Sequence, residues 1–311
     1  MLVEVDAKEY FSYFVTDPNP FISSAFIQLN KKKTDKIIGL VSDKSTKELG
    51  LIAGMRNGIL KSPFSAPFGG FHFRSEQVYS GEIDAFVSSL KEYIVSNSLG
   101  GIEVTLSPDL YSPSFNAKII SSLLRNNFVS SIPEITNWVN LDDFNYAFTK
   151  KNSREYFRQA LRNELAFSLS QSLDDKNDVY MLIYENRARH NRPIYMSFED
   201  LTDVSGIWPV DYFEVRTKES VLVASAIFYR SRPDICYAVF WGDNDIGRPL
   251  RAMDYLILNL WSHYKRLGYR WVDLGISSES GVPNEGLLRF KETHDAVSSL
   301  RFKFSWYSKV P

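Results

Sequence analysis

Basic side chains near the carboxyl end of the chain could hold an anionic substrate. A strand-like run, YRWVDLG, delivers Asp273 into a polar loop, and the chain then continues through GLLRFKETH, which contains Arg289 and Lys291. An arginine and a lysine ahead of a final strand suit the recognition of a phosphate or carboxylate. The alternative is that both side chains form structural ion pairs with Asp273 or Glu285, and composition by itself favours that alternative.

A second basic cluster lies where a strand runs into a helix, in FWGDNDIGRPLRAMDYL. The loop contains Gly242 and Gly247, and we expect the helix to begin at about Arg248 with Pro249 in its first turn. A helix N-terminus presents unpaired N–H groups and a partial positive charge, to which Arg248 and Arg251 add full charges. A phosphate or pyrophosphate could bind there, although paired arginines at a helix start are more often simply solvated.

The loop KSPFSAPFGGFHF, Lys61–Phe73, combines two prolines, two glycines and four phenylalanines. Proline stiffens such a loop, whereas glycine permits close approach of the backbone to a neighbour. One interpretation is a ligand-binding loop that faces a cleft between domains, and the other is a stiff turn that buries aromatic side chains. We weigh the two equally. The ligand-contacting candidates are Ser62, Ser65, Phe68, Gly69 and Gly70.

The segment NSREYFRQALRNELAF predicts a helix with three arginines on one face. Arg154, Arg158 and Arg162 recur at every fourth position, which places them on one side of a helix. A solvated face is the usual reason for such a stripe, and an interdomain groove is the functional alternative.

Several kinds of site lack support in the sequence. The histidines, at positions 72, 190, 263 and 294, show neither metal-binding spacing nor the environment of a serine triad. No GxxxxGK[ST] motif occurs, and no GxGxxG follows a strand. The single cysteine, Cys236, excludes an internal disulfide and a cysteine-rich zinc site. The sequence therefore predicts neither a metal enzyme nor a nucleotide hydrolase.

The overall composition is that of an ordinary globular protein. Hydrophobic residues make up 44% and charged residues 23%, and the formal net charge is −1. This charge disfavours bulk binding of nucleic acid. The single cysteine indicates a reducing compartment, and no run of apolar residues is long enough for a membrane span. We therefore expect a cytoplasmic protein.

Hydrophobic periodicity predicts the elements that must position the basic residues. In the first half, strands at KIIGLVSD, IEVTLSP and ITNWVNLDDF alternate with helices over 81–97 and 112–128, the second with Ser112 as N-cap. In the second half, a helix from about Arg154 precedes the strands DYFEVRTKE, SVLVASAIFYRS and ICYAVFWGD, which we expect to form an antiparallel meander. A further helix and the strand YRWVDLG follow.

The length and a polar junction indicate two domains. A chain of 311 residues exceeds the size, roughly 250–300 residues, at which a single core stops growing. Lys150–Ser153 is polar and precedes a new helix, so we place the boundary between 149 and 150. Each half contains a strand pair, a Gly/Pro-containing loop, a long helix that ends in glycine and a short strand. The fold class is therefore α/β (α+β), with an architectural repeat.

The order of four segments resembles the GNAT superfamily, in particular FemABX-like proteins with two tandem GNAT domains. The segments are KKNSREYFRQALRN, SVLVASAIFYRSRPDICYAVFWGDN, AMDYLILNLWSHYKRLGYRWVDLGISS and GLLRFKETHDA. The first half matches more loosely, through NPFISSAFIQLNKKKTDKIIGLV. The resemblance implies two GNAT-like domains, 1–149 and 150–311, each with a mixed, mostly antiparallel sheet flanked by helices.

The resemblance also implies a function. FemABX-like and GNAT proteins transfer an acyl or aminoacyl group to an amine or hydroxyl, here of a sugar or cell-envelope precursor, without a covalent enzyme intermediate. The donor would be acyl-CoA or aminoacyl-tRNA, and no metal is needed. The acetyl-CoA loop of GNAT enzymes, Q/RxxGxG/A, would fall at DNDIGRPLRAM, which has only one glycine. The alternative is therefore a non-catalytic binding protein that kept the tandem fold.

Within this resemblance the candidate residues take roles. Lys291 is a catalytic candidate that, with Arg289, would hold donor or acceptor phosphates. Tyr255 or Tyr237 would be the proton donor to the leaving group, and Asp273 is a weaker candidate for general base. Donor or acceptor binding falls to the remaining candidates, which are Arg248, Arg251, Arg289, Trp241, Arg154, Arg158 and the residues of the aromatic loop.

Overall fold

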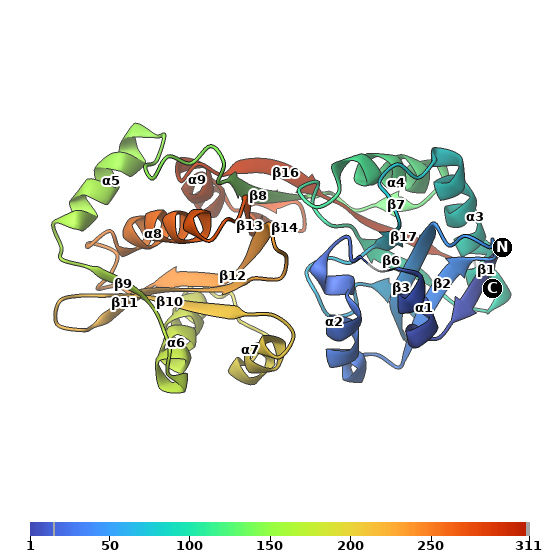
Figure 1. The fold of residues 1–311 in the computed structure, drawn as a ribbon, viewed down its shortest axis with the longest axis horizontal. Coiled ribbons are helices and arrows are strands. Elements are labelled where there is room, and N and C mark those ends of the chain that lie inside the picture. Colours follow the sequence, from blue (N-terminus) through green and yellow to red (C-terminus); the bar gives the residue numbers. More distant parts are fainter. Residues whose placement is uncertain (15, 309–311) are drawn as a thin grey trace. The chain divides into compact units, whose positions relative to one another are not determined.

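The computed structural model describes residues 1–14 and 16–308, which form two units. The first unit comprises Met1–Thr136, Ser278–Pro283 and the chain from Ser299 onward; the second comprises Asn137–Ser277 and Asn284–Ser298. Each unit is built on one mixed sheet with helices against it (Figure 1). This confirms the predicted α/β class. The two units are defined by contacts within the folded chain and do not test which parts fold independently. The domain boundary between 149 and 150 therefore remains a prediction.

The sheet of the first unit has the strand order β1-β2-β3-β4-β6-β17-β7, with β5 paired to β3. The pairings are antiparallel except between β4 and β6, where Ile59 lies opposite Gly101 in a parallel register. The strands are β1 (Leu2–Val5), β2 (Lys36–Ser42), β3 (Leu49–Arg56), β4 (Ile59–Ser62), β5 (Phe71–Phe73), β6 (Gly101–Thr105), β7 (Val129–Ser130) and β17 (Lys303–Tyr307). A small hairpin, β14 (Ser278–Glu279) with β15 (Val282–Pro283), belongs to the same unit.

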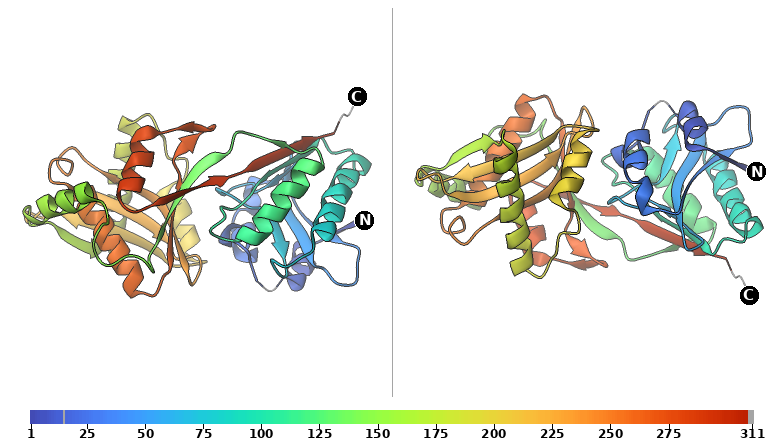
Figure 2. Two further views of the ribbon diagram at one scale, coloured as in Figure 1. Left: turned by 90° about the horizontal axis from the view of Figure 1, so that it is seen from above. Right: turned by 90° about the horizontal axis from the view of Figure 1, so that it is seen from below.

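Helices cover both faces of this sheet. The predicted helices are confirmed as α3 (Ser80–Ser96) and α4 (Pro113–Arg125), which has Ser112 as N-cap and packs beside α3 (Figure 2). Their buried side chains share one core with β2, β3 and β6. On the other face, α1 (Ala7–Tyr13) and α2 (Ser24–Leu29), with the short turns η1 (Pro20–Ile22) and η2 (Lys31–Lys33), enclose a second cluster around Tyr10.

The sheet of the second unit has the order β16-β8-β13-β12-β11-β10-β9. The predicted meander is confirmed, since β10, β11 and β12 pair antiparallel in sequence order. The strands are β8 (Glu134–Asn140), β9 (Ala166–Leu169), β10 (Val210–Arg216), β11 (Leu222–Tyr229), β12 (Ile235–Asp243), β13 (Trp271–Ile276) and β16 (Val297–Arg301).

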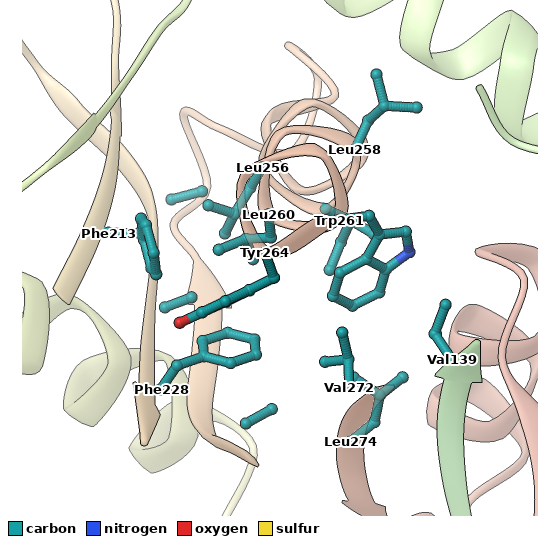
Figure 3. Close-up of a cluster of buried hydrophobic side chains, with 14 of the residues drawn as sticks. Val139, Phe213, Phe228, Leu256, Leu258, Leu260, Trp261, Tyr264, Val272 and Leu274 are labelled. Carbon is teal, nitrogen blue, oxygen red and sulfur yellow. The ribbon is translucent and has the colours of Figure 1, made fainter. Parts of the chain in front are cut away.

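The helix α8 (Ala252–Arg266) organises the core of the second unit. It packs against β10, β11 and β12, while α6 (Leu173–Arg189) contacts the same strands from the opposite face (Figure 1). Figure 3 shows Tyr264 of α8 beside Phe213 and Phe228, and Trp261 towards Val139 and Val272. The remaining helices of this unit are α5 (Lys151–Leu161), α7 (Phe198–Ser205) and α9 (Glu285–Thr293).

The predicted start of α8 at Arg248 is wrong. The helix begins at Ala252, and Arg251 has φ 58° and ψ 36°, a left-handed conformation that interrupts a right-handed helix. The loop before it has its own bonds: the Asn244 side chain accepts from the Gly247 N–H at 2.9 Å, and its backbone N–H donates to Val223 at 3.2 Å. The sequence pattern could not show this loop, because its anchor lies on β11.

The final strand expected after the basic residues is not a single strand. It divides into β16, at the edge of the second sheet, and β17, which pairs with β6 and β7 in the first sheet. Phe304 of β17 is fully buried in the core of the first unit. The chain therefore completes its first sheet with its last strand, a pairing of distant segments for which the local sequence carries no signal.

Within the described residues, no helix has the length and apolar character needed to cross a membrane.

Candidate active site

Two strands of the second sheet diverge beside a small cavity. The parallel strands β12 and β13 pair over only three positions, which end at Tyr237 opposite Asp273. Beyond that point β12 continues beside β11, and β13 continues to Ile276. A cavity of about 190 Å³ is lined by residues of both diverging ends and by Lys291 of α9. Diverging parallel strands leave backbone groups without a ladder partner, so this is a natural place for a ligand.

Lys291 donates hydrogen bonds to the backbone at the diverging end of β13. Its Nζ donates to the carbonyl oxygens of Leu274, Gly275 and Ile276, each at 2.9 Å, and the residue is only 2% exposed. Three consecutive carbonyls at the end of β13 thus accept hydrogen bonds from one ammonium group, which has three donors. Lys291 therefore fixes the backbone at the cavity wall.

The same burial changes the acidity of Lys291. Burial lowers the pKa of Lys291 to about 7, and the nearby charge of Asp273 opposes this shift. Asp273 is itself buried, and its Oδ1 accepts from the Gly275 N–H at 2.8 Å. The structure thus brings Lys291, Asp273 and Tyr237 together, with the lysine poised to exchange a proton near neutral pH.

A larger cavity of about 640 Å³ adjoins the small one, because Arg187, Trp241 and Leu287 line both. It is bounded by the end of α6, the loop between β12 and α8, and α9. Four arginines contribute to its lining, and two carboxylates do so as well. The arginines are Arg187, Arg192, Arg248 and Arg251, and the carboxylates are Asp243 and Asp254.

The arginines are held in different ways. The guanidinium of Arg251 stacks over the Tyr156 ring at 3.9 Å from its centroid, and Arg248 lies 3.8 Å from Asp243. Nε of Arg187 donates to the Arg192 carbonyl at 3.1 Å, and burial, with the charge of Arg192, lowers the pKa of Arg187. Positive charge therefore exceeds negative charge around the cavity, which suits an anionic ligand.

Tyr255 and Arg289, two predicted site residues, lie away from these cavities. Tyr255 stacks on Phe157 with ring centroids 6.0 Å apart, and burial raises its pKa. Arg289 points to solvent. Neither lines either cavity, and their proposed roles remain predictions.

The arginine stripe of α5 is turned away from the larger cavity. Arg154 donates to the Phe148 carbonyl at 3.1 Å, and Arg158 is exposed, 3.5 Å from Glu155. Tyr156 lines the cavity from the same helix. A residue two positions away lies about 200° around a helix, so the stripe and Tyr156 occupy opposite sides.

The aromatic loop is packed inside the first unit. Ser62 Oγ accepts from the Gly70 N–H at 3.1 Å, and Ser65 Oγ donates to Asn30 Oδ1 at 3.0 Å. Phe68 is 1% exposed; its ring lies edge-on to Phe21, 4.9 Å away, and tilted against Tyr111, 5.0 Å away. A Cβ on Gly69 would lie 2.7 Å from the Pro63 nitrogen, so glycine is needed for this close approach. These are contacts of a stiff buried turn, and the ligand contacts of this loop remain predictions.

Sequence reasoning missed several cavity residues. Arg187 and Arg192 belong to the basic segment NRARHNR, and the positive charge of this segment could have indicated them. Asp254 and His294 are far apart in the sequence and meet only in the folded chain. Tyr156, which also lines the larger cavity, was not predicted, because the candidates chosen from its helix were the arginines.

No protein-family model and no curated protein matches the sequence. Solved structures do match across the whole chain. FemX superposes with a TM-score of 0.68 at 10% identity, covering 99% of this chain and 97% of that one. A tandem GNAT protein from the clavulanic acid biosynthesis pathway gives 0.61 at 11% identity, covering 100% and 99%. The L-PGS of Bacillus licheniformis gives 0.59 at 14% identity, covering 98% and 91%.

At these identities the likeness establishes the fold. The chain has the tandem GNAT-like, FemABX-like fold, which confirms the prediction made from the order of its segments.

Proposed function

We propose that this protein is an acyl- or aminoacyltransferase whose reaction site is the pair of adjoining cavities in the second unit. The observation that carries the proposal is Lys291, a buried lysine with a pKa of about 7 at the point where β12 and β13 diverge. The fold shared with FemX and with a tandem GNAT protein supports the same class of reaction.

The chemistry needs no covalent enzyme intermediate. An amine or hydroxyl of the acceptor attacks the activated carbonyl of the donor, a C–N or C–O bond forms, and the bond to the leaving thiol or ribose oxygen breaks. The leaving atom gains one proton and the attacking atom loses one. Lys291 can give a proton in its charged form and take one in its neutral form, because its pKa lies near neutrality. Tyr237, in the wall of the same cavity, is a second candidate donor.

The larger cavity would hold the donor. Arg248 and Arg251 precede α8, and with Arg187 and Arg192 they offer four cationic groups for the phosphates of an acyl-CoA or of an aminoacyl-tRNA end. The donor supplies the activated carbonyl. The acceptor that we propose is an amine, or less favourably a hydroxyl, on a sugar or cell-envelope precursor, as the resemblance to FemABX-like proteins implies, and the proposed location is the cytoplasm.

A second candidate function is a binding protein without catalysis. One observation favours it: all three donors of Lys291 are engaged by backbone carbonyls, which gives this lysine a purely structural role if no carbonyl is released. In that case a ligand would bind in the larger cavity and no acyl group would move.

Donor titrations followed by transfer assays test the proposal. A donor at about a hundred times its dissociation constant should stabilise the fold by roughly 2.7 kcal/mol, which is visible as a rise in Tm. Acetyl-CoA, longer acyl-CoAs and aminoacyl-tRNA are compared with free CoA and uncharged tRNA. Transfer to amine acceptors that falls at least tenfold in Lys291→Met, with the Tm rise retained, supports the catalytic role. Binding without transfer from any donor would leave only the binding protein.

A further inference from the structure

A carboxylate and an imidazole meet in the wall of the larger cavity. Asp254 lies in the first turn of α8 and His294 directly follows α9, and their side chains are 9% and 3% exposed. Nε2 of His294 lies 3.0 Å from Oδ1 of Asp254, and its Nδ1 lies 2.7 Å from the Phe290 carbonyl oxygen. Both residues line the cavity.

Both ring nitrogens of His294 have oxygen partners. A neutral imidazole has a single N–H, whereas both nitrogens of His294 face an oxygen. The Phe290 carbonyl can only accept, and Nε2 faces the carboxylate oxygen Oδ1 of Asp254. His294 therefore orients the carboxylate through a charge-assisted hydrogen bond.

The second oxygen of this carboxylate is still available. Among the described residues, none donates a hydrogen bond to Oδ2 of Asp254. The Asp254 side chain is 9% exposed and lines the cavity, so a ligand bound there can donate a hydrogen bond to this oxygen. Asp243, the other carboxylate of the cavity, differs because Arg248 lies 3.8 Å from it.

Aromatic rings in the same cavity favour a cationic ligand. Trp241 and Phe290 line the same cavity, with ring centroids 6.1 Å apart in an edge-to-face arrangement. The faces of aromatic rings attract ammonium groups, and the cavity also contains the Asp254 carboxylate. Arg248, by contrast, has a side chain that is 58% exposed, so positive charge reaches the more open part of the cavity while Asp254 lies in the buried part.

We propose that the larger cavity binds a phosphorylated amine, with its phosphate on the arginines and its protonated amine on Oδ2 of Asp254. This deepens the proposed function, because it names the chemistry of a reactant. The ammonium group could belong to the acceptor, as in an amino-sugar phosphate, or to the donor, as in an aminoacyl ester of a nucleotide. Acetyl-CoA has no ammonium group beside its acyl carbonyl.

Matched probes test the proposal on the unaltered protein. Calorimetric titration compares glucosamine 6-phosphate with glucose 6-phosphate, and puromycin 5′-phosphate, an aminoacyl-nucleotide analogue, with its N-acetyl form. In at least one pair the ammonium form should bind about 10- to 100-fold more tightly, the range expected of a charge-assisted hydrogen bond. The pair that shows the preference identifies acceptor or donor. Equal affinity within both pairs, or no binding of any probe at millimolar concentration, would overturn the proposal.

A substitution then assigns the preference to Asp254. Asp254→Asn should abolish the ammonium preference while the ammonium-free probe keeps its affinity, and Asp245→Asn, at an exposed position of the neighbouring loop, should change neither. A preference that survives in a folded Asp254→Asn variant contradicts the assignment. Transfer assays separate the proposed transferase function from the proposed ammonium site. Efficient transfer by Asp254→Asn would support the transferase function and contradict the ammonium site. An ammonium preference that depends on Asp254, without transfer from any donor, would support the ammonium site and contradict the transferase function.

Discussion

The lowered pKa of Lys291 predicts how the free energy of unfolding depends on pH. The pKa of Lys291 is lowered from 10.5 to about 7 by burial, although the charge of Asp273 opposes the shift. Between these two values the unfolded chain binds a proton that the folded chain does not bind. The free energy of unfolding therefore rises with pH across this window, and the contribution of Lys291 is least favourable below pH 7.

The size of the effect follows from the shift. Each pKa unit corresponds to about 1.4 kcal/mol, and integration from pH 7 to pH 9, with Lys291 half-protonated at pH 7, gives about 2 kcal/mol. Lys291→Met keeps the length and apolar stem of the side chain but cannot titrate. The free energy of unfolding of the unaltered protein should thus rise by about 2 kcal/mol relative to the variant over this range.

Urea unfolding at half-unit steps of pH, followed by tryptophan fluorescence, measures the difference. Both proteins share their other titrating groups, so these cancel in the comparison. Lys265→Met is the matched control for the loss of one charge, since Lys265 also donates to a backbone carbonyl, at 2.8 Å to Leu141, but is only half-buried. Parallel curves for the unaltered protein and Lys291→Met would refute the lowered pKa and with it the proton exchange proposed for Lys291.

Three further substitutions, one with a matched control, test the fold and the larger cavity. Phe304→Ala should destabilise the first unit by about 3–5 kcal/mol, because the ring is fully buried there. Hydrogen exchange should show that β6 loses protection, and unchanged exchange would contradict the pairing of β17 with β6. Gly69→Ala should cost about 1–3 kcal/mol in urea unfolding, since its Cβ would lie 2.7 Å from the Pro63 nitrogen, whereas Gly81→Ala, with nothing within 4 Å, should be neutral or stabilising. Arg251→Gly should raise Tm through relief of about 1 kcal/mol of left-handed strain yet weaken binding of phosphorylated ligands, and an unchanged affinity would remove Arg251 from the site.

Sequence patterns predicted the local elements well, for reasons that are local. The periodic apolar positions of α3 and the Ser112–Pro113 start of α4 specify helices without reference to the rest of the chain. The meander from β10 to β12 was equally predictable, because short connections join strands that pair with their neighbours in sequence. The order of the segments then sufficed to predict the tandem fold.

The candidate site was predictable only in part. Lys291 and Asp273 were found together because they flank one loop, but the three carbonyl partners of Lys291 depend on the divergence of β12 from β13. The stripe that begins at Arg154 looked like a binding face, and the helix is instead turned so that Tyr156 reaches the cavity. Rotation of a helix about its axis is fixed by what it packs against, and a stripe of charges does not encode it.

The sequence by itself thus determined the elements, their order and the charges available to a site, because propensity, capping and periodicity act over a few residues. Tertiary structure alone decided which distant groups meet. The last strand, β17, joins the first sheet, and Asp254 and His294, 40 positions apart, form one pair. The physical reason is that such contacts are stabilised by burial and hydrogen bonding between segments whose separation along the chain leaves no local trace.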